Sequence, residues 1–362
     1  MTKPFSLFSR YLFGIFIKSI LAVFAIASFL IYVLDIIELT RISNDASARA
    51  LMGAAELSLL RTPMVAEQVL PFACLFGALF AFLSLARSRE LVIARAAGMS
   101  VWRFLRPPMA AAFVLGAAAT LVFNPLSSAL KALADQATTA IIDQAGQNHG
   151  KNVWIRQKSV DGDAILRANS IDTAASQFEN VTAFEFDHQG AFVHRIEAHS
   201  ARLMDGYWLM TNARLLTPGA PPEYYNTYEL PTYLTAGQIR QTLSDPETIS
   251  FYDLPSWARA TEAAGLDSAR YFQQYYALLA RPILMVAMLM VAATVTLRFS
   301  RTGAQVTSIL SGIGAGFALY VANKVMTDFG AAGMISPSLT SFISPVIVGL
   351  LCTLLLLYQE DG

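Results

Sequence analysis

The sequence predicts an α-helical membrane protein with six transmembrane helices, three before and three after an inserted all-β domain. Of its 362 residues, 55% are hydrophobic and only 14% are charged, whereas a soluble domain carries about 25% charged residues. Six apolar runs are long enough to cross a hydrocarbon core, which takes about 20 helical residues. Between the third and fourth runs the composition becomes mixed and polar.

The first three runs lie in residues 1–130, which we predict as one membrane unit. A basic and aromatic segment, residues 1–18, is typical of a membrane interface and leads into the first helix. A polar linker then extends to Thr62, and Pro63 is predicted to begin the second helix. Pro107 and Pro108 are predicted to begin the third, with Asn124 marking its far end. The apolar runs themselves are 19–34, 69–86 and 107–130.

Residues 131–274 are predicted to form the β domain with helical connectors. Apolar residues alternate with polar ones around Phe184 and Trp208, which is the period of a half-buried strand. Turn dipeptides separate these runs, namely Asp161-Gly162, Asp205-Gly206 and Pro218-Gly219, together with 187–190. The segments 126–144 and 253–276 at the two ends of the domain are predicted to be helical.

The last three runs lie in residues 275–362. The fourth run, 275–297, is interrupted by Arg281 and Pro282, and the fifth and sixth are 302–323 and 329–357. The fifth contains Gly312, Gly314 and Gly316, a small-residue stripe that permits close helix contact.

Residues 87–106 form the most basic short segment of the chain, and its first part, 87–98, is predicted to be a short helix. Ser88 is predicted to cap it, Glu90 to lie in its first turn, and Gly98 to end it as a left-handed residue. Glu90, Ala94 and Ala97 would share one face, so that a partner protein could approach closely. An ordinary anchoring loop on the positive side of the membrane is an equally good interpretation of the residues alone.

The distribution of Lys and Arg predicts the orientation. One side carries ten basic residues near the helix ends: Lys3, Arg10, Lys18, Arg87, Arg89, Arg95, Arg103, Arg106, Arg298 and Arg301. The short loop on the other side has only Arg41, Arg49 and Arg61. We therefore expect both termini to be cytoplasmic and the β domain to lie outside, which in a bacterium means the periplasm.

Several classes of chemistry are not supported. The sequence has no P-loop, no His-Glu-x-x-His and no Gly-x-Ser-x-Gly elbow, so we expect neither an ATPase site nor a catalytic residue in this chain. The four histidines, all in the β domain, are spread along the chain, and we expect no metal site. The net charge of +0 gives no field that attracts nucleic acid. Cys74 and Cys352 lie in apolar runs as packing residues.

Basic residues at the outer level are candidates for contact with an anionic lipid headgroup. They are Arg41, Arg61, Lys131, Arg281 and Lys324. Lys324 is followed four residues later by Asp328, so a helix-surface ion pair is the simpler interpretation of that lysine.

Several motifs resemble the LptF/LptG lipopolysaccharide-export permeases. Residues 87–92 and 97–100 are similar to the short cytoplasmic helix that follows the second span in that family. Residues 265–271, leading to Pro282, resemble the approach to its fourth span, and 196–209 resemble its periplasmic strands. The resemblance covers the whole chain, and the loop helix, the 267–271 run and the short C-terminal tail are more like the LptG branch than the LptF branch.

The resemblance implies an inner-membrane permease whose β domain is a periplasmic jellyroll. It would pair with an LptF-like permease, and a cytoplasmic LptB-like ATPase dimer that holds ATP and Mg would dock on the loop helix. Lipopolysaccharide would leave the inner membrane and pass to LptC-like and LptA-like jellyroll proteins. The docking residues carried over from the family are Arg89, Glu90, Leu91, Ala94, Ala97 and Gly98, with Glu90 as the contact to the ATPase. The lateral gate carried over to the first and fifth spans falls on Leu34, Gly312, Gly316 and Tyr320.

One stretch departs from the family pattern. Relatives have lysines at the outer end of the first span, whereas here only Arg41 is basic there. Headgroup contact in this chain would then fall to Lys324 or to the partner permease, or the lipid would carry less phosphate. The remaining alternatives are a permease of another envelope-lipid or lipoprotein ABC system, a membrane enzyme acting on lipid carriers, and an envelope scaffold that transports nothing.

Overall fold

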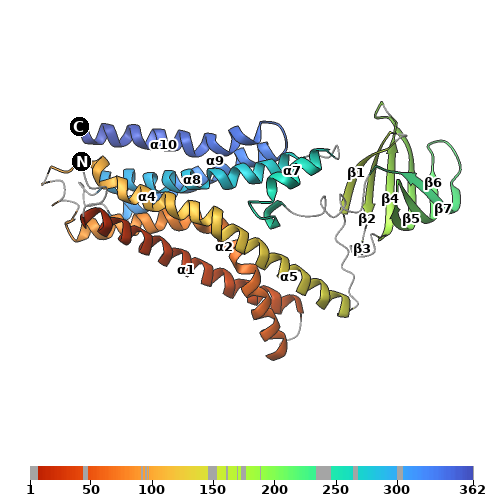
Figure 1. Ribbon diagram of the computed structural model, residues 1–362, viewed down its shortest axis with the longest axis horizontal. Helices are drawn as coiled ribbons and strands as arrows, with labels where there is room; N and C mark the ends of the chain where they lie inside the picture. The colour runs from red at the N-terminus through yellow and green to blue at the C-terminus, as the bar shows by residue number, and fades with distance from the viewer. Residues whose placement is uncertain are drawn as a thin grey trace. The chain divides into compact units, whose positions relative to one another are not determined.

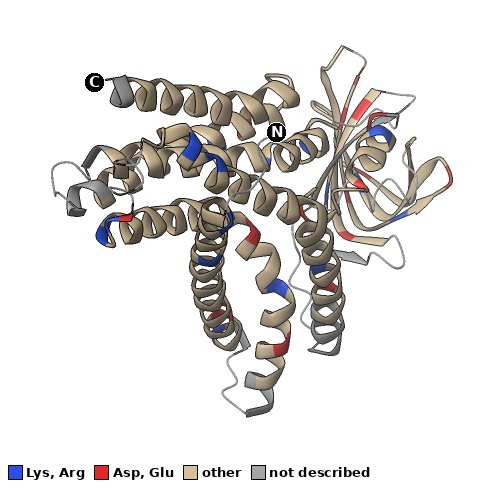
Figure 2. Cartoon of the chain, turned by 60° about the vertical axis from the view of Figure 1, so that its left-hand side comes forward, with Lys and Arg blue, Asp and Glu red and all other residues tan. Residues whose placement is uncertain are grey.

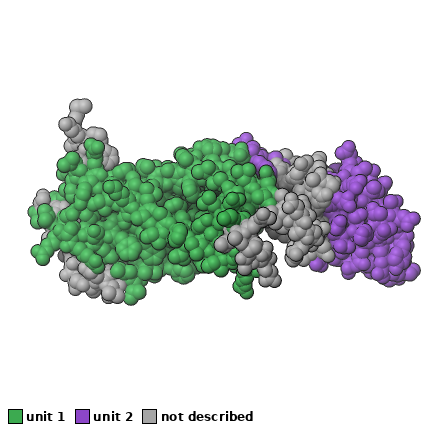
Figure 3. All heavy atoms as spheres, turned by 90° about the horizontal axis from the view of Figure 1, so that it is seen from below, with its two compact units in different colours: residues 1–137, 247–255, 269–362 green, residues 138–246, 256–268 purple. Residues whose placement is uncertain are grey.

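The protein divides into a helical unit and a unit that contains a β-sheet. The computed structural model describes residues 7–43, 48–90, 93, 96, 98–145, 153–159, 162–168, 170–172, 177–187, 189–233, 246–263, 268–299 and 305–361. Unit 1 comprises 1–137, 247–255 and 269–362, and unit 2 comprises 138–246 and 256–268 (Figure 3). The predicted insert, 131–274, contains all the strands described below.

Unit 1 confirms the six predicted membrane helices. Within the described residues, six helical segments have the length and composition to cross a membrane: Leu7–Arg41, Met52–Arg87, Val101–Ala137, Ala269–Leu297, Ile309–Ala331 and Pro337–Tyr358. They lie in α1 (Leu7–Ser43), α2 (Ala48–Arg87), α4 (Val101–Ala118) with its continuation, α8 (Ala269–Phe299), α9 (Gln305–Ala331) and α10 (Pro337–Asp361). The start of α1 and the end of α10 lie at the same end of this unit (Figure 1).

The predicted starts of the second and third helices are wrong, because prolines lie inside both. Pro63 is within α2, and Pro107 and Pro108 are within α4, which begins after the cap residue Ser100. A proline removes one backbone hydrogen bond, whereas ending a helix leaves several backbone groups without an intrahelical partner. The helices therefore continue through their prolines.

The third membrane helix does not end at Asn124 as predicted. After α4 the backbone forms a π-helical turn, η1 (Ala119–Phe123), and then continues as α5 (Asn124–Ala145). The connector predicted for 126–144 is confirmed as part of α5. Within the exit connector predicted for 253–276, the described residues form α7 (Leu254–Ala263) and the first part of α8, and a 3-10 turn, η2 (Pro246–Thr248), precedes them.

The turn between α9 and α10 lies later than the apolar runs indicate. Helix α9 extends to Ala331, so Phe329 belongs to the fifth helix and not to the sixth. Gly333 adopts a left-handed conformation (φ 69°) and its amide donates to the carbonyl of Gly330, as at a helix C-terminus. Pro337 then begins α10, at a position where its missing N–H costs nothing.

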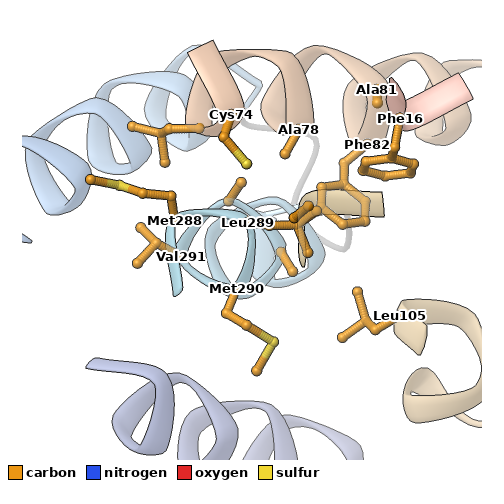
Figure 4. Packing of buried hydrophobic residues seen from close by; sticks show 14 of the residues in the cluster. Phe16, Cys74, Ala78, Ala81, Phe82, Leu105, Met288, Leu289, Met290 and Val291 are labelled. Atoms are coloured by element: carbon orange, nitrogen blue, oxygen red, sulfur yellow. The ribbon is translucent and has the colours of Figure 1, made fainter. Parts of the chain in front are cut away.

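The core of unit 1 forms around α8, with α1 and α2 on one side of it (Figure 4). Phe16 of α1 and Phe82 of α2 meet edge to face with ring centroids 4.7 Å apart. Gly77 lets α1 approach α2 closely, since a Cβ there would lie 2.5 Å from the Cα of Ile20. Few charged residues occur along these helices (Figure 2), as expected where lipid or protein surrounds them.

Unit 2 contains one antiparallel sheet of seven strands within the described residues (Figure 1). Its order is β1-β2-β4-β5-β6-β7, with β3 paired to β4, so apart from β3 each strand pairs with the next one in sequence. The strands are β1 (Val153–Ser159), β2 (Gly162–Ala168), β3 (Ser170–Asp172), β4 (Gln177–Phe186), β5 (Phe192–Met204), β6 (Tyr207–Leu216) and β7 (Glu223–Pro231). The predicted turn at 205–206 is confirmed, with Gly206 at φ 90° between β5 and β6.

One face of this sheet is apolar and buried. Trp208 lies against Phe178 with ring centroids 4.9 Å apart, and both side chains are fully enclosed. The indole Nε1 donates to Oε1 of Gln157 (2.8 Å), which also accepts the hydroxyl of Thr232 (2.7 Å). The buried polar atoms of Trp208 and Thr232 are thus paired, as burial in an apolar face requires.

Candidate functional site

The segment after α2 turns sharply and then becomes helical again. Arg89 adopts a left-handed conformation (φ 62°), which is uncommon for a residue with a side chain. The chain is helical at Glu90, Ile93 and Ala96, and the amide of Ile93 donates to the carbonyl of Arg89 (3.0 Å). Gly98 is left-handed (φ 76°) as predicted. Leu91, Ala94 and Ala97, three of the predicted docking residues, lie outside the described residues.

The capping role predicted for Ser88 stays a prediction, because residues 91 and 92 of the turn that it would cap lie outside the described residues. Its amide donates to Ser84 (2.9 Å) and its hydroxyl donates to the carbonyl of Leu85 (3.3 Å), so Ser88 closes the end of α2. Ser100 caps the next helix, since its hydroxyl accepts the amide of Arg103 at the start of α4 (3.3 Å).

Glu90 and the helical turn after it form a surface with both apolar and charged side chains. The side chain of Ile93 is 65% exposed, and Ala96, three residues later on the same side, is exposed too. Glu90 is half-buried and accepts a hydrogen bond from the hydroxyl of Tyr11 in α1 (3.3 Å). An exposed apolar side chain beside a carboxylate, close to several arginines, is chemically suited to contact with another protein.

The predicted gate residues of the fifth span pack against the second span. A Cβ on Gly312 would meet the Leu79 side chain at 3.0 Å, and one on Gly316 would meet Leu75 at 2.1 Å. The ring of Tyr320 lies 4.6 Å from that of Phe72. These three residues, spaced four apart on one side of α9, thus contact α2. Leu34, the gate candidate in α1, is 57% exposed.

The basic residues predicted to contact a lipid headgroup differ in their exposure and in their ion pairing. Arg41 is exposed and Arg61 is half-buried. Lys131 pairs with Asp135 (2.7 Å), and Lys324 pairs with Asp328 (3.3 Å) with both side chains more than half exposed. Their assignment to a lipid headgroup stays a prediction, and the i,i+4 partner expected for Lys324 is present.

Arg281 does not have the exposed side chain expected of a headgroup contact. It donates to the carboxylate of Glu67 and is only 15% exposed, and Glu67 is 6% exposed. Asn124 and Ser127 complete the coordination of that carboxylate, so α2, α5 and α8 meet at one buried polar cluster. The sequence motifs do not predict this cluster. The spacing along the helices could have indicated it, because Glu67 precedes Arg87 by 20 residues and Arg281 precedes Arg298 by 17. These spacings place the two side chains at similar distances, about 30 Å and about 26 Å, from the basic ends of their helices.

Unit 2 has a histidine–carboxylate pair on the same face of the sheet as its apolar core, because Glu185 and His194 each lie two residues from a core residue, Ala183 and Ile196. His194 of β5 pairs with Glu185 of β4, and these two residues are opposite each other in the sheet. The hydrogen bond that Tyr225 donates to Glu223 (2.6 Å) raises the pKa of this tyrosine. No three His, Cys, Asp or Glu side chains gather in a metal-binding arrangement among the described residues, and the expected absence of a metal stays a prediction.

Comparison with known proteins identifies the family. Residues 10–359 match the family of the lipopolysaccharide export system permease LptF/LptG. The chain belongs to this family. The lipopolysaccharide export system permease protein LptG of Escherichia coli strain K12 is 22% identical over 340 residues, which cover 89% of this chain and 90% of the relative. The LptG of Escherichia coli O6:H1 shows the same identity and coverage.

Membership of the LptF/LptG family confirms the resemblance found in the sequence. It also confirms the fold class of a multi-pass helical membrane protein with an inserted β domain, since the matched residues contain all six membrane helices and the sheet. The similarity to LptG relatives agrees with the sequence of the loop helix, which is more like that of the LptG branch.

Proposed function

We propose that this chain is one of the two permease subunits of an ABC transporter that extracts lipopolysaccharide from the inner membrane. Its LptG relatives are named as lipopolysaccharide export permeases, and they match the chain over nearly its whole length. The proposal assigns the chain no ATPase site of its own. The energy would come from a partner, an LptB-like ATPase dimer that binds ATP and Mg on the cytoplasmic side.

The observation that carries the proposal is the exposure of two membrane helices that flank a third. In the most apolar stretch of α1 only 6% of the residues are buried, and in that of α9 only 17%, against 61% for α2 and 67% for α8. Both α1 and α9 pack against α2. Their outward faces carry large apolar side chains, among them Phe29, Leu30, Leu34, Ile313, Phe317 and Val321.

Such a surface suits the acyl chains of a lipid and a second membrane subunit. Helices in a bilayer associate by shape and polar contacts, because lipid tails are as apolar as Leu side chains. We propose that an LptF-like permease faces α1 and α9 and that the lipid lies between the two subunits. The gate helices would then be the two spans that this chain buries least.

Docking of the ATPase would use the turn that contains Glu90, Ile93 and Ala96. Closure of the ATPase dimer would move this turn, and its covalent connection to α2 and α4 would transmit the movement into the membrane. The Tyr11–Glu90 hydrogen bond gives α1 a direct contact with the same turn.

The β domain would receive the lipid on the periplasmic side, together with LptC-like and LptA-like proteins. Exposing acyl chains to water costs about 0.8 kcal/mol per methylene group. A path lined by apolar side chains would avoid that cost.

The test is purification of the complex in mild detergent, followed by ATP hydrolysis and lipid-transfer assays. We expect an ATPase and a second six-span permease to copurify with this chain. Glu90→Ala should lower both the amount of bound ATPase and lipid-stimulated hydrolysis, and Glu56→Ala, at the other end of α2, serves as the control. Purified complexes without any nucleotide-hydrolysing subunit would contradict the proposal.

Depletion in cells separates transport from the remaining alternatives. Accumulation of lipopolysaccharide in the inner membrane is expected for the proposed permease. Accumulation of a lipoprotein or another lipid instead would indicate a different ABC system, and no accumulation would indicate a scaffold.

A further inference from the structure

The buried cluster around Glu67 joins three membrane helices. Its carboxylate accepts hydrogen bonds from Nδ2 of Asn124 (3.0 and 3.3 Å), from Oγ of Ser127 (2.8 Å) and from the guanidinium of Arg281. The donors come from α5 and α8, and the acceptor from α2. Every charge in the cluster is therefore paired, and its members would move together, because separating the ion pair would leave a buried charge unpaired.

The same cluster holds the chain as it returns from the β domain. Oδ1 of Asn124 accepts the backbone amide of Phe251 (2.9 Å), and that bond is buried. The hydroxyl of Tyr252 donates to the carbonyl of Leu121 in the π-helical turn (3.1 Å). The ring of Phe251 stacks on Tyr275 of α8, with centroids 5.2 Å apart and planes at 12°.

A further contact fixes the beginning of this returning segment. Nε2 of Gln68, the neighbour of Glu67 in α2, donates to Oε2 of Glu247 (3.2 Å). Residues 247–255 belong to unit 1 although they lie in sequence between β7 and α8. The return path from the β domain is thus attached to α2 and to the start of α5.

Asn124 therefore lies where both connections to the β domain begin. It is the first residue of α5, which leads toward β1, and it binds Phe251 in the segment that follows β7. The preceding π-helical turn η1 changes the hydrogen-bond register at this point, and such turns are frequent at functional sites.

We propose that Asn124 and Glu67 are positioning residues that couple movement of α2 and α8 to both connections of the β domain, so that the domain accepts lipid in step with the membrane helices. This inference rests on the proposed function. A purely stabilising role explains the cluster less well, because replacing a buried ion pair by apolar residues is often neutral or stabilising. Apolar replacements would fill the same space, but they would leave the Phe251 amide without the acceptor that Oδ1 of Asn124 provides.

The test compares three variants of the full transporter complex. Asn124→Ala removes the link between the Glu67 cluster and Phe251, and Ser127→Ala removes one donor to Glu67. Ser128→Ala is the matched control, because the adjacent hydroxyl is also buried but donates only to the carbonyl of Pro125 in its own helix (3.0 Å).

Three quantities are measured on each complex: hydrogen exchange of residues 247–255, the rate of ATP hydrolysis, and lipid transferred per ATP to a purified LptA-like acceptor. In Asn124→Ala we expect faster exchange at Phe251, unchanged assembly and hydrolysis, and transfer per ATP lowered about tenfold, as for a typical allosteric coupling. Ser127→Ala should change transfer in the same direction but less, and Ser128→Ala should leave all three quantities as in the parent complex.

The outcomes separate this inference from the proposed function. Unchanged protection of Phe251 in Asn124→Ala would overturn its role as an anchor. Faster exchange with full transfer would overturn the coupling and leave the proposed function intact. A parent complex that transfers no lipid would contradict the proposed function, whereas the exchange result would still decide the anchor. If Asn124→Ala does not assemble, Ser127→Ala and Tyr252→Phe carry the test, and full transfer in both would overturn the coupling.

Discussion

Helices α2 and α8 differ from α1 and α9 in what surrounds them. The first pair is mostly enclosed by its own chain, and the second pair is mostly exposed. Mean hydropathy does not separate the pairs, because the most and the least hydropathic of the six spans, α1 and α9, are both exposed. In a bilayer, apolar character indicates only that a helix is in the membrane, since lipid and protein interior are equally apolar.

Polar residues separate the two pairs where hydropathy does not. Helices α2 and α8 carry Glu67 and Gln273, which are buried, and Arg281, which is largely buried, and all three are paired. Gln273 donates to Ser341 of α10 (2.9 Å) and accepts from Thr340 (2.7 Å). The charged residues of α9, Lys324 and Asp328, are exposed near its end. Buried charged and amide side chains therefore mark the enclosed helices, and exposed apolar faces mark the helices that we propose contact lipid and partner.

The largest effect is expected from breaking the ion pair of the enclosed helices. Arg281→Gln leaves the Glu67 carboxylate buried without its cation, and losing one partner of such a pair costs about 3–5 kcal/mol. We expect a large fall in the thermal unfolding midpoint in detergent. The double variant Glu67→Gln/Arg281→Gln removes both charges and should regain most of the loss. A double variant as unstable as the single one would contradict this account of the pair.

A smaller effect is expected where an exposed helix approaches an enclosed one. The Cβ introduced by Gly77→Ala would meet the backbone of Ile20, which cannot move aside without shifting α1. Overpacking of this kind costs about 1–3 kcal/mol. Gly14→Ala in α1, whose Cβ would meet nothing within 4 Å, is the control. Equal melting temperatures for the two variants would show that α1 does not pack closely against Gly77.

The contact of α9 with α2 should be more tolerant. Gly316→Ala would press on a Leu75 side chain, which yields more readily than backbone, so we expect a loss of about 1 kcal/mol. Gly314→Ala, two residues away with open space around its Cβ, should be neutral in unfolding experiments. If Gly314→Ala were the more harmful variant, the packing face of α9 would be misassigned.

The smallest effect on stability is expected at Lys324. An exposed ion pair contributes about 0–1 kcal/mol, so Lys324→Gln should unfold at nearly the parent temperature. If Lys324 contacts an anionic headgroup, lipopolysaccharide affinity should fall about fivefold, since one lysine near such a surface contributes about 1 kcal/mol. Asp328→Asn should not lower affinity. Unchanged affinity in Lys324→Gln would exclude this headgroup contact.

The sequence predicts the spans well because apolar length is a local property. It predicts Gly98 and Gly206 correctly for the same reason, since a left-handed turn depends on one residue. It fails at Pro63 and Pro107, where the cost of interrupting a helix outweighs a local signal. It also misses the contact of Glu67 with Arg281, which are 214 residues apart. Pairing of residues so far apart in sequence depends on how α2 and α8 pack, and this packing cannot be inferred from a single sequence.

The measurement that tests the central claim most directly is photo-cross-linking in cells that contain the whole transporter. A photoreactive phenylalanine replaces Phe29 of α1 or Phe317 of α9, both well exposed, or Leu354 of α10, which is 65% exposed but outside the proposed path. We predict capture of lipopolysaccharide from Phe29 and Phe317, dependent on an active ATPase, and little capture from Leu354. Equal capture at all three positions, or capture at Leu354 alone, would contradict a lipid path along α1 and α9.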